Sequence, residues 1–303
     1  METMFEQVRS NKRKSYLLMA FFILVIGLMG AVFGLLWENI YAGLILSMLI
    51  SIPYAAFSYY TGDWMILAMT GSRAVTKREY PYLYHTIEGL AIAAGVPAPK
   101  AYVIDDSALN AFATGRDPEH ASITVTTGLL KAMNRQELEG VIAHEMSHVR
   151  NYDIRFMMLT TVMVGLVTLL SDFILRGVWY GGRGRRSEGG RGSGGQLQII
   201  LLVFGIFFAL IAPIIGQLIR LAISRQREYL ADANAAVLTR YPPGLASALK
   251  KIAKDPDPLV DNANKATAHL FISTPFREYR GFVESFFSTH PPVEDRIKRL
   301  EEM

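Results

Sequence analysis

Residues 141–149 have the residue types and spacing of a metal-dependent hydrolase. They read Val-Ile-Ala-His-Glu-Met-Ser-His-Val, an H-E-x-x-H pattern within an apolar frame. On an α-helix, His144 and His148 lie four residues apart and share one face. Two imidazoles on one face can bind one metal ion, and Glu145 is placed to act on a water molecule as general base. The pattern predicts a zinc-dependent peptidase site.

A third protein ligand must come from elsewhere in the chain. The sequence has no cysteine and only six histidines, so a carboxylate on a helix is the natural choice. Glu228 is the best candidate, and Asp232 follows on the same face of a predicted helix at 220–236. Glu228 would bind the metal, while Asp232 would accept a hydrogen bond from the far nitrogen of a ligating histidine. We expect one Zn²⁺ per chain, although the same ligands suit other divalent ions.

The elements that must position these residues can also be predicted. Asn134 and Glu137 have capping-box spacing before the H-E-x-x-H segment, and no proline or glycine interrupts residues 141–149, so that segment is expected to be helical. A helix is predicted at 80–94. Strands are predicted at 101–104 and 108–114, with a half-buried strand at 121–127. His85 and His120 are expected to be structural or exposed.

The composition indicates a membrane protein. Hydrophobic residues make up 51% of the 303 residues and charged residues only 19%. Uncharged or nearly uncharged runs at 16–37, 40–60, 156–175 and 197–219 are each long enough to cross a bilayer as a helix. The first run is too long for a cleaved signal peptide, and no cleavage site followed by a polar mature chain is present.

The charge pattern predicts the orientation. Arg9, Lys12, Arg13 and Lys14 precede the first span, which favours a cytoplasmic amino end and a catalytic domain on the same side of the plasma (inner) membrane. The net charge of +4 is read as this topology signal, so no nucleic-acid partner is expected. A Gly/Arg-rich stretch at 181–195 is read as a disordered loop, with RNA or anionic lipid binding as the alternative. If spans three and four both cross, its arginines lie outside, so a re-entrant hairpin stays open as well.

Taken together, these motifs resemble the HtpX family of integral membrane zinc metalloproteases, which is related to the CAAX prenyl endoproteases. The resemblance covers essentially the whole chain except the Gly/Arg loop. The matching pieces are His144-Glu145-Met146-Ser147-His148, Glu228-Tyr229-Leu230-Ala231-Asp232, Asn110-Ala111-Phe112-Ala113-Thr114-Gly115, and Thr289-His290-Pro291-Pro292 with Arg296. It implies a mainly α membrane protein, with four transmembrane helices and a gluzincin-type α+β zinc metalloprotease domain containing a small sheet.

The resemblance also implies roles. His144, His148 and Glu228 would bind zinc, Glu145 would deprotonate the attacking water and protonate the leaving amine, and Asp232 would support a ligand. Asn110 and Ala111 resemble an edge strand that pairs with the substrate backbone. His290 and Arg296 resemble the pair that stabilises the oxyanion.

We expect four segments: 1–61 with the first hairpin, 62–155 with the H-E-x-x-H helix, 156–222 with the second hairpin and its loop at 177–196, and 223–303. His148 lies about 12 Å along a helix from Phe156, so the active site should lie near the membrane surface. The expected function is cleavage of misfolded or damaged membrane proteins, with polypeptides and the lipid bilayer as partners. A narrow-specificity processing protease and a zinc-binding scaffold without catalysis are the alternatives.

Overall fold

The computed structural model describes residues 4–36, 38–163, 165, 225–255, 267, 270–272 and 291–303. The elements in chain order are α1 (Met4–Leu36), α2 (Ile40–Met69), β1 (Arg73–Ala74), α3 (Pro81–Ala94), β2 (Lys100–Ile104), β3 (Ala111–Gly115), η1 (Pro118–His120), β4 (Ala121–Thr126), α4 (Thr127–Ala132), α5 (Arg135–Arg150), α8 (Arg225–Thr239), α9 (Pro242–Ala253) and α11 (Val293–Glu301). The expected fourth span, most of the third, the Gly/Arg loop and His290 lie outside the described residues.

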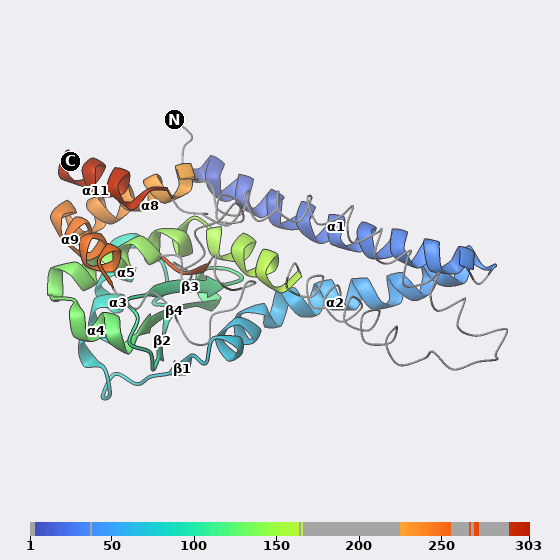
Figure 1. Cartoon of the computed structure of the whole chain (residues 1–303), viewed down its shortest axis with the longest axis horizontal. Helices are drawn as coiled ribbons and strands as arrows, with labels where there is room; N and C mark the ends of the chain where they lie inside the picture. The colour runs from blue at the N-terminus through green and yellow to red at the C-terminus, as the bar shows by residue number, and fades with distance from the viewer. Residues whose placement is uncertain are drawn as a thin grey trace, which may run out of the picture.

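Helices α1 and α2 form a long hairpin that projects from the body of the molecule (Figure 1). Both are long and apolar enough to cross a membrane. They approach closely at their connected ends, where a Cβ on Gly43 would lie 2.1 Å from the carbonyl oxygen of Gly30. Outward-facing leucines such as Leu17 and Leu49 are 61% and 67% exposed, as expected of side chains that face lipid. Two of the expected spans therefore coincide with candidate membrane helices, which form a hairpin.

Helix α2 continues to Met69, whereas the second span was expected to end near residue 60. Residues 61–69 hold no proline, and the buried side chain of Ile66 packs into a core cluster beside the sheet. Thr70 caps the helix, and Gly71 follows with a φ of 66°, a backbone conformation that favours glycine. The end of the membrane hairpin is thus continuous with the body of the protein.

The body is built on a four-stranded sheet in the order β1-β2-β4-β3. Strands β2 and β4 are parallel, while β1 and β3 pair antiparallel at the two edges. Strand β4 was expected to be half-buried, but all of its residues are buried because both faces of the sheet are covered. Alternate residues of β3 show this, since Ala111 and Ala113 join the core under α5 and Phe112 joins the core next to the membrane hairpin.

Strand β3 begins at Ala111, later than the expected strand at 108–114. Polar side chains hold the preceding residues in a loop. A carboxylate oxygen of Asp106 accepts a hydrogen bond from the backbone N–H of Ala108 at 2.8 Å, and the hydroxyl of Thr126 donates to the Ala108 carbonyl. Such side-chain bonds compete with the strand ladder and delay its start.

Helix α5 forms where the sequence predicts it. The expected capping box is present, with Asn134 accepting from the Glu137 backbone and Glu137 accepting from the Asn134 backbone. Twelve of the sixteen residues of α5 are buried, and the helix packs against β3, α3, α8 and α9. Helices α8, α9 and α11 lie at the same end of the molecule as α5 (Figure 1). This arrangement brings residues that are far apart in the sequence into contact with the buried helix α5.

Candidate metal centre

Three side chains converge at the meeting point of α5 and α8. The Nε2 atoms of His144 and His148 lie 3.3 Å apart. Each also lies 3.6 Å from a carboxylate oxygen of Glu228. The three residues are 1%, 5% and 3% exposed, so little water reaches them. Within the described residues, this is the one group of metal-ligand side chains whose donor atoms all approach one another so closely.

The separations fit a single small cation. Nitrogen and oxygen ligands lie about 2.0–2.2 Å from zinc with tetrahedral angles, which separates neighbouring donor atoms by about 3.4 Å. The observed distances of 3.3 and 3.6 Å match that spacing. His144, His148 and Glu228 would therefore hold the metal and leave further positions open, as catalytic sites require.

The far nitrogen of His144 is held by Asp232 on α8. The Nδ1 atom lies 2.9 Å from a carboxylate oxygen of Asp232. Burial lowers the pKa of His144, but hydrogen bonds with Asp232 and Glu228 outweigh burial and raise the pKa to about 9. In the neutral imidazole that binds a metal, the hydrogen bond with Asp232 would keep the proton on Nδ1. The lone pair of Nε2, the nitrogen on the side of Glu228, would then be free for the metal. The predicted partnership of Asp232 with a ligating histidine is present in the geometry.

A second carboxylate, Asp153, holds His148, and the sequence analysis missed it. Its Oδ2 atom lies 3.1 Å from Nδ1 of His148, and the carboxylate is buried. Burial lowers the pKa of His148, but the hydrogen bond with Asp153 and the charge of Glu228 raise it overall. The available signal was an acidic residue five positions after the second histidine, just beyond the end of α5. Both histidines therefore direct a lone pair towards the same point.

The charges of the site favour a dication. Four carboxylates are buried here, from Glu145, Asp153, Glu228 and Asp232. Arg296 and Arg227 supply two positive charges within the same cluster. A histidine that binds a metal must be neutral, and with both histidines in that state the formal balance is −2. Since buried charge is expensive unless it is compensated, a divalent cation suits this donor set.

Glu145 lies beside the ligands and is only 3% exposed. It follows His144 directly on α5, so its carboxylate is carried by the same rigid helix as the two histidines. Burial lowers the pKa of Arg296, but the negative charges of Asp232, Glu228 and Glu145, in that order of size, raise it overall. The role of Glu145 as the general base of a peptidase stays a prediction.

Arg296 was expected to stabilise an oxyanion together with His290. In the structure its guanidinium forms a two-point ion pair with Asp232, with N···O distances of 2.8 and 2.7 Å. It is 2% exposed, and a third nitrogen contact reaches Glu228 at 3.8 Å. Arg296 therefore orients and neutralises the carboxylate that holds His144. Its role towards an oxyanion stays a prediction, and His290 lies outside the described residues.

Asn110 and Ala111 lie at the start of edge strand β3, and both are buried. One side of β3 pairs with β4. On the other side, the Ala111 carbonyl accepts a hydrogen bond from the backbone N–H of Ile272 at 2.9 Å. Phe271 packs edge-on against Phe112, with ring centroids 5.2 Å apart. Part of the outer edge expected to bind substrate is thus covered by residues 270–272.

The remaining histidines of the described body lie away from this centre. His85 is exposed beside Glu88, and His120 is exposed beside Asp117. Both were expected to be structural or exposed, and both are exposed.

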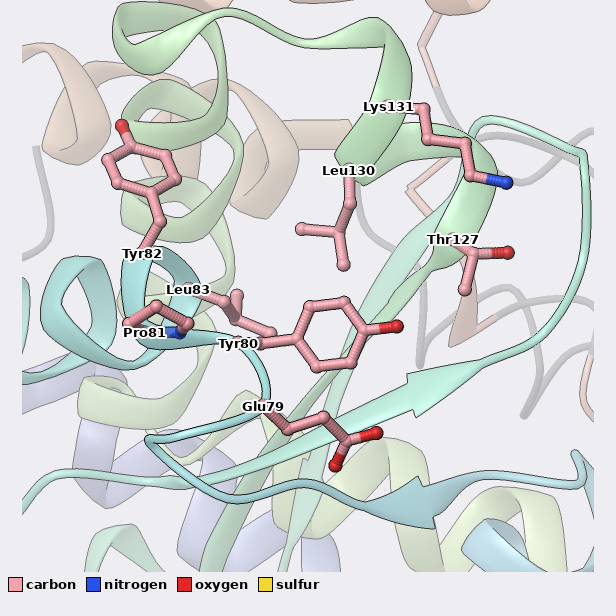
Figure 2. Close-up of a pocket in the computed structure, with 8 residues that line it drawn as sticks. All are labelled: Glu79, Tyr80, Pro81, Tyr82, Leu83, Thr127, Leu130 and Lys131. Atoms are coloured by element: carbon pink, nitrogen blue, oxygen red, sulfur yellow. The ribbon is translucent and has the colours of Figure 1, made fainter.

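The structure also contains a pocket whose lining differs from the residues of the metal centre (Figure 2). It is formed between the start of α3 and α4, with the Tyr80 ring facing Leu130 across it. The lining residues are Glu79, Tyr80, Pro81, Tyr82, Leu83, Thr127, Leu130 and Lys131. None of the candidate site residues lines this pocket.

Comparisons with known proteins agree with the geometry. The model of peptidase family M48 matches residues 77–303. The chain is 46% identical to a protein named "Protease HtpX homolog" from Thermoanaerobacter pseudethanolicus, over 100% of this chain and 98% of that protein. A protein of the same name from Streptococcus gordonii is 41% identical, over 99% of this chain and 100% of that protein.

A solved structure shares the fold. The crystal structure of S. mikatae Ste24p superimposes with a TM-score of 0.50 and 22% sequence identity. The match covers 92% of this chain and 62% of the Ste24p chain. At this identity the similarity shows the fold, and the function must be argued from the site.

Proposed function

The chain belongs to the HtpX-type members of peptidase family M48, which makes it a membrane-associated metalloprotease, and we propose that it is a zinc-dependent endopeptidase that cuts misfolded or damaged membrane proteins. The observation that carries the chemistry is the convergence of two Nε2 atoms and the Glu228 carboxylate within 3.6 Å. Each far nitrogen is tied to its own buried carboxylate. We assign His144, His148 and Glu228 as the metal ligands.

Each polar residue of the centre has a task in this proposal. Zinc held there would act as a Lewis acid towards water and the substrate carbonyl. Glu145 accepts the proton of the attacking water and passes it to the leaving amine. Asp153 and Asp232 fix the tautomers of the two histidines, and Arg296 keeps Asp232 ionised in a buried setting. His290 and Arg296 would stabilise the negative charge that develops on the carbonyl oxygen.

The substrate is proposed to bind as an extended strand along β3. Asn110 and Ala111 would offer it backbone groups, as in other cases of strand addition. The contact between Ile272 and Ala111 bears on this, because a substrate can pair at Ala111 only after residues 270–272 leave that edge. Backbone pairing accepts many side chains, which suits a protease that acts on damaged chains of varied sequence.

The membrane arrangement is also part of the proposal. We infer four spans, in the segments 1–61 and 156–222, and a catalytic domain formed by 62–155 and 223–303 on the cytoplasmic side. Support comes from the basic residues before the first span and from the core shared by the membrane hairpin and the sheet. This places the active site close to the membrane surface, within reach of the cytoplasmic parts of membrane proteins.

A matched pair of substrates tests the substrate class. Purified protein in lipid vesicles would be mixed with an unfolded polypeptide, either anchored by a transmembrane helix in the same vesicles or supplied free in solution. The proposal predicts faster cleavage of the anchored form at equal total concentration, because anchoring raises its concentration near the site. Cleavage of the soluble form alone would contradict it. The Glu145→Gln chain serves as the blank.

A further inference from the structure

The first turns of α1 lie against the turn that ends α5, at the end of the molecule that contains the metal centre (Figure 1). The Lys12 ammonium lies 4.1 Å above the ring of Tyr152. Tyr152 has a φ of 60°, an uncommon conformation for a residue other than glycine, which makes the chain turn sharply after α5. This contact joins the start of the first membrane helix to the segment directly after His148.

Asn11, the residue before Lys12, also contacts this segment and is only 2% exposed. Its amide nitrogen has two hydrogens, and both are used. One goes to the backbone oxygen of Asn151 at 2.9 Å, and the other to Oδ1 of Asp153 at 2.7 Å. A buried amide that makes two well-formed bonds across the fold fixes the position of its partners strongly.

The carboxylate of Asp153 links this contact to the metal centre. Its Oδ1 accepts from Asn11, and its Oδ2 faces Nδ1 of His148 at 3.1 Å. Arg227 approaches Oδ1 from α8 at a longer distance of 3.4 Å. Among the residues that the structure describes, Asn11 therefore makes the shortest hydrogen bond to the Asp153 carboxylate, which contacts His148.

We propose that Asn11 is a positioning residue of the metal centre, acting on His148 through Asp153. The start of α1 is then a working part of the active site as well as the beginning of a membrane span. The inference rests on the proposed function, since it assumes that His148 binds the metal. The competing view is a plain packing contact, which would stabilise the fold without affecting the metal.

Zinc affinity separates the two views, and it can be measured without peptidase activity. The full chain in detergent would be titrated against a chromogenic chelator, for wild type, Asn11→Ala and Asp153→Asn. Loss of a carboxylate that supports a ligand weakens metal binding by about 10- to 100-fold. Loss of one hydrogen bond to a charged group predicts about tenfold for Asn11→Ala. Asn11→Leu retains the side-chain volume and should behave like Asn11→Ala.

Ser15→Ala is the matched control. Ser15 is buried on the same face of α1, but its hydroxyl donates only to the carbonyl of Asn11, at 2.8 Å, and does not reach Asp153. The zinc affinity of the Ser15→Ala chain should stay within about twofold of that of wild type. The double variant adds a further test, because Asn11→Ala should have almost no additional effect once Asp153→Asn is present.

The spectrum of Co²⁺ bound in place of zinc reports the orientation of His148 directly. It should change in Asn11→Ala and remain unchanged in Ser15→Ala. Wild-type zinc affinity in Asn11→Ala and Asn11→Leu would overturn the inference and leave the proposed function intact. The inference would also be overturned if Asn11→Ala lowered zinc affinity by the same factor in the wild-type chain and in the Asp153→Asn chain. A wild-type chain that binds no zinc would instead overturn the proposed function, and this inference with it.

Discussion

At the scale of single residues, buried opposite charges hold the site together. Asp232 contacts both Arg296 and His144, and all three side chains are almost fully buried. Burial raises the pKa of Asp232, but the charges and hydrogen bonds of Arg296 and His144 together outweigh burial and lower the pKa to about 2. A charge removed from such a cluster leaves its partner uncompensated in a medium that solvates it poorly.

Replacing Asp232 by Ala should therefore lower stability as well as metal binding. We expect the free energy of unfolding to fall by about 3–5 kcal/mol, because Arg296 loses its partner. Zinc affinity should fall by about 10- to 100-fold, because His144 loses its hydrogen-bond acceptor. Denaturant titration in detergent and chelator competition measure the two effects.

The double variant with Arg296→Met separates these effects. Removing both charges should restore much of the stability lost in Asp232→Ala, while zinc affinity stays low. Recovery of zinc affinity in the double variant would show that Asp232 acts only through Arg296.

Glu137 predicts a pH dependence that is independent of the metal. Burial raises its pKa, but hydrogen bonds from Lys251 and Ser247, at 2.6 and 2.7 Å, and from the Asn134 backbone outweigh burial and lower it. A lowered native pKa means that this stabilisation is complete above the unfolded pKa of about 4.3 and is lost as pH falls through the native value.

Wild type should therefore be more stable than Glu137→Gln near neutral pH, and the difference should shrink below about pH 4. Unfolding of both chains across a pH series measures it. In the Lys251→Met background the difference should depend less on pH. A difference that stays constant down to acidic pH would contradict the argument.

At this scale, the sequence predicts those site residues that share a local helical spacing. His144, Glu145 and His148 follow from spacing on one helix, and Glu228 with Asp232 from spacing on another. The contacts of Asp153 with Asn11 and of Arg296 with Asp232 join residues 142 and 64 positions apart. No local pattern encodes such pairings, because they depend on how the helices pack.

At the scale of elements, the position of α5 depends on how closely α9 approaches it. A Cβ on Gly140 would lie 2.7 Å from the backbone nitrogen of Leu245 in α9. The three nearest atoms are the backbone nitrogen, Cα and Cβ of Leu245, none of which can move by rotation of a side chain. The separation of α5 from α9 is therefore set by the absence of a side chain at this position.

Replacing Gly140 by Ala should push the two helices apart and destabilise the protein by about 1–3 kcal/mol. Gly89→Ala in α3 is the matched control, because a Cβ there meets no atom within 4 Å. Alanine favours a helix over glycine, so Gly89→Ala should stabilise by up to about 1 kcal/mol. Thermal unfolding of the two variants should show shifts of opposite sign, and equal shifts would contradict this reading.

The element boundaries show where pattern reading stops. The capping box before α5 is local chemistry and was predicted correctly. The extension of α2 and the late start of β3 were not, because Ile66 responds to a core formed by distant segments and residues 106–110 to side-chain hydrogen bonds. Local signals place the centre of an element more reliably than its ends.

At the scale of the whole molecule, the membrane hairpin and the sheet share a core. Leu18 and Phe22 of α1 belong to the same cluster as Phe112 of β3 and residues 156–159, which follow Asp153. The catalytic body is thus packed directly on the hairpin. The sequence predicts the hairpin from its hydropathy, but the shared core could be seen only in three dimensions.

Single cysteines test the proposed orientation, because the chain contains none of its own. Glu38, between α1 and α2, should face the outside, and Ile92, which is 83% exposed on α3, should face the cytoplasm. In intact cells, a membrane-impermeant maleimide should label the Glu38→Cys chain and should reach the Ile92→Cys chain only after the membrane is opened. Leu49→Cys, within the hairpin, should stay unlabelled in both cases. The reverse pattern for Glu38 and Ile92 would contradict the proposed topology.

The most direct test of the central claim compares wild type with Glu145→Gln, measuring casein cleavage and bound zinc on the same detergent-purified samples. Wild type should cut casein, and Glu145→Gln should be slower by about 100-fold or more, because the general base is lost. Both should bind about one zinc per chain, because His144, His148 and Glu228 are intact. Equal cleavage by the two chains would contradict the role of Glu145, and a wild-type chain without zinc would contradict the metal centre itself.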